Sequence, residues 1–85
     1  MSDLSKQPNI GKDTEAKLIQ VGISSFSELK VTGTEQAFLR LQAIDPGACI
    51  QLLYGLHAAI EGIPVNQLTD EKKQELKMFH KISQK

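Results

Sequence analysis

The chain has 85 residues, enough for one domain with a modest core but too few for a deep catalytic cleft with its own lid. Ten basic and ten acidic side chains give a formal net charge of zero, whereas dedicated nucleic-acid binders normally carry a basic excess. A single cysteine leaves no internal disulfide, and we find neither a signal peptide nor a run long enough to cross a bilayer. We expect one cytoplasmic domain over residues 1–85, without membrane contact.

Glycines and capping residues divide the first third of the chain into short helices. At most a short helix is expected before a second one over residues 13–21. Gly22 stands where the left-handed C-terminal cap of that helix belongs. Ser25 and Glu28 have the spacing of a capping box, so a further helix is expected to begin at Ser25 and to end at residue 29 or 30.

Two longer helices are expected in the middle of the chain. Gly33 breaks the chain, and Thr34 is expected to cap a helix that ends at residue 43. Asp45 before Pro46 is the clearest helix-start signal, because a capping carboxylate precedes a proline at the first helical position. The resulting helix is expected to cover residues 46–61.

The helix over residues 46–61 is apolar around most of its circumference, so it is expected to be the central one. Cys49 is placed on its apolar face as a small hydrophobe, and Tyr54 near its polar edge as the mark of a partner contact. Gly55 costs about 1 kcal/mol of helix propensity relative to alanine, which predicts the close approach of another helix there.

A last helix is expected to begin near Thr69, with an inner stripe of Leu76, Phe79 and Ile82 and with Met78 beside it. No stretch of the sequence shows sustained alternation of apolar and polar residues, so no strand is predicted. The expected fold is all-α, a compact bundle of about five short helices related to helix-hairpin-helix folds.

Lysines recur every four residues along the last helix, at Lys73, Lys77 and Lys81. This stripe predicts a basic surface for a phosphate backbone or an acidic partner, with contacts that salt would weaken. The alternative is a solvated outer face whose lysines complement the C-terminal end of the helix dipole.

The segment around Ile10 and Gly11 is the feature that hints at a ligand. A turn, a glycine, a lysine and a helix start follow one another, as in helix-hairpin-helix elements, whose turn amides hold a DNA phosphate without reading bases. In this interpretation Ile10 is buried and Gly11 offers open backbone, while Lys12 and Lys17 supply positive charge. In the structural alternative, Gly11 permits a tight turn and Ile10 plugs the core beneath it.

Metal and nucleophile chemistry have few candidates in this sequence. These are His57, His80 and Cys49, and no second pair of ligands at metal spacing accompanies them. His57 lies four residues before Glu61, close enough for a hydrogen bond on one helix. We predict no catalytic, cofactor-binding or metal-binding residue and expect that the protein is not an enzyme.

From about Leu4 to Phe79 the chain resembles the C-terminal domain of TfoX (Sxy), the bacterial regulator of natural competence. The resemblance rests on the joint order of Asn9-Ile10-Gly11, Leu18, Val21-Gly22-Ile23, Phe26, Leu29, residues 33–41, Leu53-Tyr54-Gly55-Leu56, Ala59-Ile60, Gly62, Leu68 and Leu76. It identifies the chain as similar to stand-alone members that consist of this domain.

The resemblance implies a helical domain without enzymatic activity, from a family linked to transcriptional control of DNA-uptake genes. The N-terminal domain of the full-length regulator has no counterpart in this sequence, so the competence role itself is not carried over. We expect a regulatory binding module that contacts a protein partner or, weakly, DNA. The alternatives are a sequence-independent DNA-binding domain and a structural domain that forms a homodimer through the central helix.

Overall fold

The computed structural model describes residues 4–7 and 10–83, which form five α-helices, two 3-10 helices and no strand. In chain order these are η1 (Leu4–Lys6), α1 (Lys12–Gln20), α2 (Phe26–Thr32), α3 (Thr34–Ile44), α4 (Ile50–Glu61), η2 (Val65–Gln67) and α5 (Asp70–Ser83). The predicted all-α bundle is confirmed. Within the described ranges, no helix combines the length and apolarity needed to cross a membrane.

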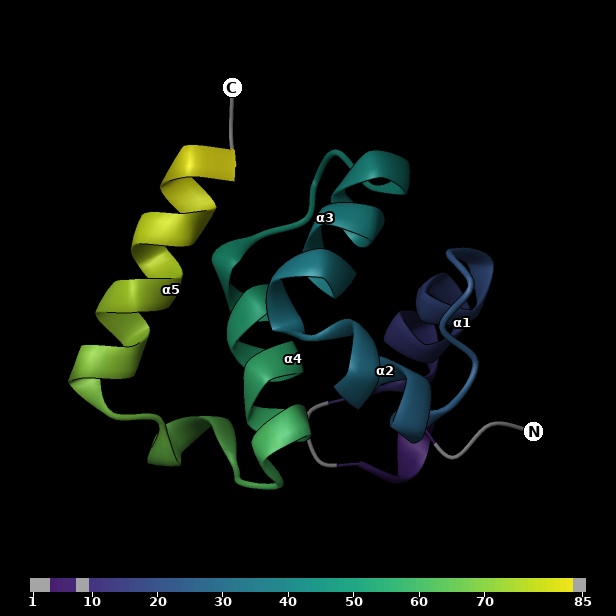
Figure 1. Cartoon of the computed structure of the whole chain (residues 1–85), viewed down its shortest axis with the longest axis horizontal. Coiled ribbons are helices and arrows are strands. Elements are labelled where there is room, and N and C mark those ends of the chain that lie inside the picture. Colours follow the sequence, from purple (N-terminus) through teal and green to yellow (C-terminus); the bar gives the residue numbers. More distant parts are fainter. Residues whose placement is uncertain (1–3, 8–9, 84–85) are drawn as a thin grey trace.

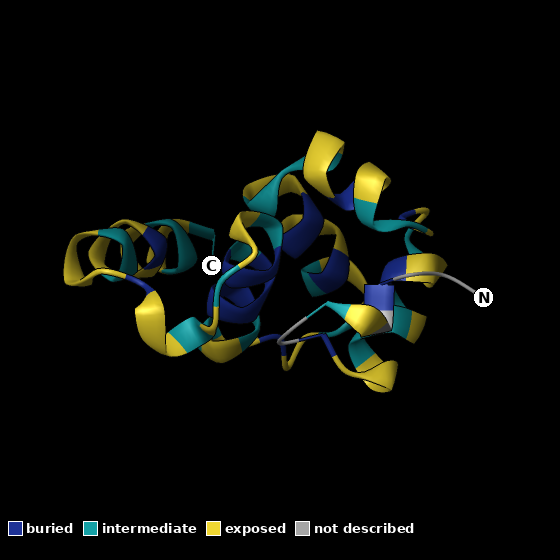
Figure 2. Ribbon diagram, turned by 90° about the horizontal axis from the view of Figure 1, so that it is seen from below, coloured by how far each residue is buried: buried dark blue, intermediate teal, exposed yellow. Residues whose placement is uncertain are grey.

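Helix α4 lies in the middle of the bundle and packs against α2, α3, α5 and η2. Figure 1 shows α5 along one side of it and α1 on the other, with α2 and α3 between. Buried residues concentrate on α4 and on the helices that face it (Figure 2). Its six buried residues are Leu53, Tyr54, Gly55, Leu56, Ala58 and Ala59. These contacts confirm the predicted central position of α4. A helix that is apolar around most of its circumference has to be covered by its neighbours on most sides.

The end of α1 and the start of α2 follow the sequence signals. At the end of α1, the N–H of Ile23 donates to the carbonyl of Leu18 at 2.9 Å, and the N–H of Gly22 donates to the carbonyl of Ile19 at 3.1 Å. This pair of bonds is a Schellman motif, and it requires the positive φ of 90° that Gly22 adopts. At the start of α2, the Ser25 hydroxyl accepts from the N–H of Glu28 at 3.1 Å, as predicted.

Two predicted helix starts are wrong. Gly33, not Thr34, is the N-cap of α3, and Thr34 is the first helical residue. Helix α4 begins at Ile50 and not at Pro46, because the Asp45 side chain closes a turn instead of capping a helix. Its Oδ1 accepts from the N–H of Gly47 at 3.0 Å, two residues on, which is an Asx turn.

The shorter α4 also corrects the placement of Cys49. This residue is the N-cap of α4, and its side chain is exposed instead of lying on an apolar face. The Tyr54 prediction is wrong as well, since its side chain is 6% exposed and belongs to the core. A partner cannot reach a phenol ring that the rest of the bundle already covers.

Helix α5 is held by only part of its predicted inner stripe. Leu76 is buried and Phe79 half-buried, with the Phe79 ring 6.3 Å from the ring of Phe38 on α3. By contrast, Met78 is 61% and Ile82 71% exposed, so the apolar pattern of α5 continues onto its solvent side. The start of the helix is as predicted, because the Thr69 hydroxyl accepts from the N–H of Lys72 at 3.1 Å.

Candidate functional site

The predicted phosphate site lies at the start of α1. Ile10 is 4% exposed and packs into the core, as both interpretations of this segment require. Its N–H donates to the carbonyl of Gln7 at 3.4 Å. The turn predicted just before it falls on residues 8 and 9, which lie outside the described residues. Gly11 and Lys12 are both exposed.

The backbone at Gly11 does not require a glycine. Gly11 is the N-cap of α1 with φ −86° and ψ 176°, an extended conformation that any residue adopts. A Cβ added there would meet no atom within 4 Å. No side chain caps this helix start. The N–H of Glu15 donates to the carbonyl of Gly11 at 2.9 Å, whereas the N–H groups of the three helical residues before it have no intrahelical acceptor, as at any helix N-terminus. An anion would find these amides beside the negative charges of Asp13 and Glu15.

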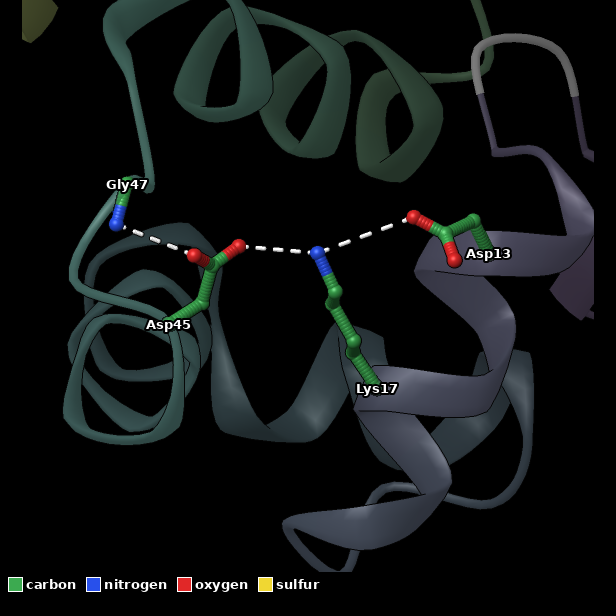
Figure 3. A network of polar contacts seen from close by, with 4 residues as sticks. All are labelled: Asp13, Lys17, Asp45 and Gly47. Atoms are coloured by element: carbon green, nitrogen blue, oxygen red, sulfur yellow. Dashed lines mark hydrogen bonds and ion pairs between the residues drawn. The ribbon is translucent and has the colours of Figure 1, made fainter.

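The Lys17 side chain lies between Asp13, in the first turn of α1, and Asp45, in the α3–α4 connection (Figure 3). Its Nζ donates to Oδ2 of Asp45 at 2.8 Å and lies 3.6 Å from Oδ2 of Asp13. The hydrogen bond from Lys17, followed by the one from the N–H of Gly47, lowers the pKa of Asp45, and the same Asp45 bond raises the pKa of Lys17. A phosphate would have to compete with two carboxylates for this ammonium group.

The predicted basic surface on α5 lies at the other end of the molecule. Lys77 and Lys81 are exposed and Lys73 is half-buried. Figures 1 and 2 both place α5 on one side of the bundle and α1 on the opposite side. The structure therefore does not bring the two groups of predicted lysines together into one continuous basic face.

A polar cluster that the sequence did not reveal lies where α3, α4 and α5 meet. The hydroxyl of Thr34 and Nδ1 of His57 are hydrogen-bonded at 3.2 Å, although the sequence spacing also allows a bond between His57 and Glu61. Lys72 and Glu75 line the same cavity of about 360 Å³ as Thr34 and His57, and Nζ of Lys72 donates to Oε2 of Glu75 at 2.8 Å. Burial, and next the nearby charge of Lys72, lowers the pKa of His57.

This cluster connects helices and does not have the arrangement of a reactive site. The bond between Thr34 and His57 joins the start of α3 to α4, and the pair formed by Lys72 and Glu75 leaves neither charge unbalanced. Among the residues that the structure describes, no group of three or more His, Cys, Asp or Glu side chains is arranged to hold a metal ion. The spacing of Lys72 and Glu75 was visible in the sequence, but the contact with Thr34 depends on how α3 packs on α4.

Comparison with known proteins gives a consistent assignment. The profile of the TfoX C-terminal domain matches residues 1–80. The fold is similar to a crystal structure, in a triclinic form, of an uncharacterized protein from Listeria monocytogenes, with 46% identity and a TM-score of 0.91 over 93% of this chain and 90% of that chain. It is also similar to a protein of unknown function from Listeria monocytogenes in a tetragonal form, with 44% identity and a TM-score of 0.92 over 95% of this chain and 100% of that chain. No curated protein sequence matches significantly. The chain therefore belongs to the TfoX C-terminal domain family, as the order of its glycines and apolar residues predicts.

Proposed function

We propose that this domain is a non-enzymatic regulatory module of the cytoplasm that acts by contacting a partner protein. The observation that carries the proposal is the distribution of charge and exposed apolar surface. The lysines at the start of α1 and those on α5 lie at opposite ends of the bundle, and α5 exposes Met78 and Ile82 to solvent. Separate small basic patches, one of them beside exposed apolar side chains, suit a protein surface better than the continuous phosphate backbone of a duplex.

A role in transcriptional control, as the family resemblance implies, is compatible with this mode of action. In such a role the domain would act through another regulatory protein. Its formal net charge of zero agrees with this, because sequence-independent DNA binders draw their affinity from a basic excess.

Weak DNA binding is the alternative with a specific observation in its favour. The start of α1 has no side-chain cap, and Gly11 and Lys12 beside it are exposed. If this were the functional site, binding to duplex DNA would be micromolar or weaker and would fall steeply with salt. Substituting both Gly11→Val and Lys12→Glu would abolish it.

Self-association through the central helix has less support. Within α4, Gln51 and Glu61 are exposed, whereas the large apolar side chains are buried or half-buried. A dimer through α4 would have to displace the neighbouring helices. Sedimentation at high micromolar concentration tests this alternative, and a clean monomer would remove it.

In-cell crosslinking tests the proposed function. A photoreactive amino acid is placed in turn at the exposed positions Lys12, Val31, Leu39 and Met78, and the adducts are treated with protease or nuclease. We expect at least one position to give a discrete protease-sensitive adduct with a second protein. Nuclease-sensitive adducts alone, or no discrete adduct from any position, would refute the proposal.

A further inference from the structure

We propose that the outer face of the C-terminal half of α5 docks an acidic, amphipathic segment of the partner protein. This face consists of Lys77, Met78, Lys81 and Ile82, and is called the α5 face below. The inference rests on the proposed function, because it names the surface used and the chemistry of the partner.

The four residues of the α5 face share one side of the helix. Their spacing of one, four and five residues places them next to one another on an α-helical surface, with Met78 and Ile82 one turn apart. All four side chains are exposed. The opposite side of the same half holds α5 on the bundle, where the rings of Phe79 and His80 lie 6.3 and 5.7 Å from that of Phe38. The α5 face is therefore not needed to attach the helix.

Charge is separated along α5 in a way that defines the partner. All acidic residues of the helix lie in its first half, at Asp70, Glu71 and Glu75. The second half carries Lys77 and Lys81 and no acidic residue. Attraction to the negative end of the helix dipole accounts for these lysines, but not for the two large apolar side chains exposed beside them. A partner that supplies carboxylates to the lysines and apolar anchors to Met78 and Ile82 would satisfy both features.

Other occupants match the α5 face less well. A nucleic acid offers phosphates to Lys77 and Lys81 but leaves Met78 and Ile82 without an apolar partner. A second copy that met this face through a two-fold axis would gather four lysines in one small interface, where they would repel one another. An acidic amphipathic helix avoids both problems, since it presents glutamates beside leucines at the matching spacing of three and four residues.

The test is a titration of the isotopically labelled protein, followed by amide chemical shifts. The probe is a designed helical peptide with leucines at every third and fourth position and flanking glutamates. Two matched peptides replace the leucines with glutamine or the glutamates with lysine. We expect the largest shifts in residues 77–83, and dissociation constants at least about tenfold weaker for both matched peptides.

Variants of the protein identify the surface. Met78→Ser with Ile82→Ser, and separately Lys77→Glu with Lys81→Glu, are each expected to weaken binding about tenfold. The matched control is Lys30→Glu with Val31→Ser, an exposed lysine and apolar pair on α2, which should leave binding unchanged. All these side chains are exposed, so the variants should keep the fold.

Several outcomes would overturn the inference. One is a set of chemical-shift changes centred outside α5, and another is a loss of binding in the α2 control as large as in the α5 variants. The same holds if the glutamine peptide binds as tightly as the parent peptide, or if vesicles that contain phosphatidylserine or duplex DNA bind as tightly or more tightly. The failure of the inference is distinguishable from failure of the proposed function. If crosslinks to a protein arise from Val31 or Leu39 but none from Met78, the module contacts a partner through another surface.

Discussion

Replacing Tyr54 with phenylalanine should stabilise the protein. The phenol oxygen of Tyr54 is buried and has no hydrogen-bond partner among the described residues. A buried hydroxyl without a partner costs on the order of 1 to 3 kcal/mol, because it has given up its bonds to water. Tyr54→Phe removes that cost and keeps the ring, which is 6% exposed and contributes its apolar burial in both proteins.

We expect the free energy of unfolding of Tyr54→Phe to rise by about 1 kcal/mol, the lower part of that range, since the neighbouring side chains relax around the oxygen in the parent protein. In a domain of this size such a gain raises Tm by about 4 to 8 °C. Urea denaturation followed by circular dichroism measures the free energy, and a thermal scan measures Tm. Tyr54→Ala is the matched control and should lose about 3 to 5 kcal/mol, because it removes the ring as well. An unchanged or lower free energy of unfolding for Tyr54→Phe would show that the buried Tyr54 hydroxyl costs the folded state nothing.

Three further predictions follow from the backbone and the charges. Gly33→Ala should lower the free energy of unfolding by about 1 to 3 kcal/mol, because φ 87° and ψ 161° lie in a region that only glycine adopts readily. Gly11→Ala, at φ −86°, should change it by less than about 0.5 kcal/mol. Thermal unfolding of the two variants compares them. Because the pKa of His57 is lowered in the folded state, the unfolded chain binds more protons than the folded one between that pKa and the ordinary 6.5. The free energy of unfolding should therefore increase with pH through this window, and the contribution of His57 should be fully present above it. Urea midpoints measured from pH 5 to pH 8 test this, and the slope should flatten in His57→Gln. Lys17→Met should raise the pKa of Asp45 toward its ordinary 3.8, because the hydrogen bond from Lys17 is the largest cause of the lowered pKa. NMR titration of the Asp45 carboxyl measures this pKa, and an unchanged value would contradict the network in Figure 3.

The sequence predicted most of the helices because their ends are marked by local chemistry. Gly22 adopts the left-handed conformation that a C-terminal cap needs, and Ser25 bonds within its own first turn. Such signals act over three or four residues, so no knowledge of the packing is required. The failure at Asp45 is local as well. The sequence Asp45-Pro46-Gly47 also fits an Asx turn, and the glycine two residues after the aspartate was the signal that could have distinguished the two.

The errors in burial have a different cause. Periodicity gives the faces of a helix but does not say how far neighbouring helices extend over them. Tyr54 is covered because α4 is enclosed by its neighbours, and Ile82 is exposed because α5 packs on the bundle through Leu76 and Phe79. The same limit applies to the candidate site. The pairing of Lys17 with Asp45 joins residues 28 positions apart, and no pattern in the sequence indicates it.

Titration of labelled duplex DNA with the purified protein tests most directly whether this module recognises protein and not a phosphate backbone. We expect no saturable binding at micromolar protein, and no difference between the parent and Lys12→Glu at salt concentrations from about 50 to about 200 mM. Saturable micromolar binding that falls steeply over this range and disappears in Lys12→Glu would contradict it. The start of α1 would then be the functional site.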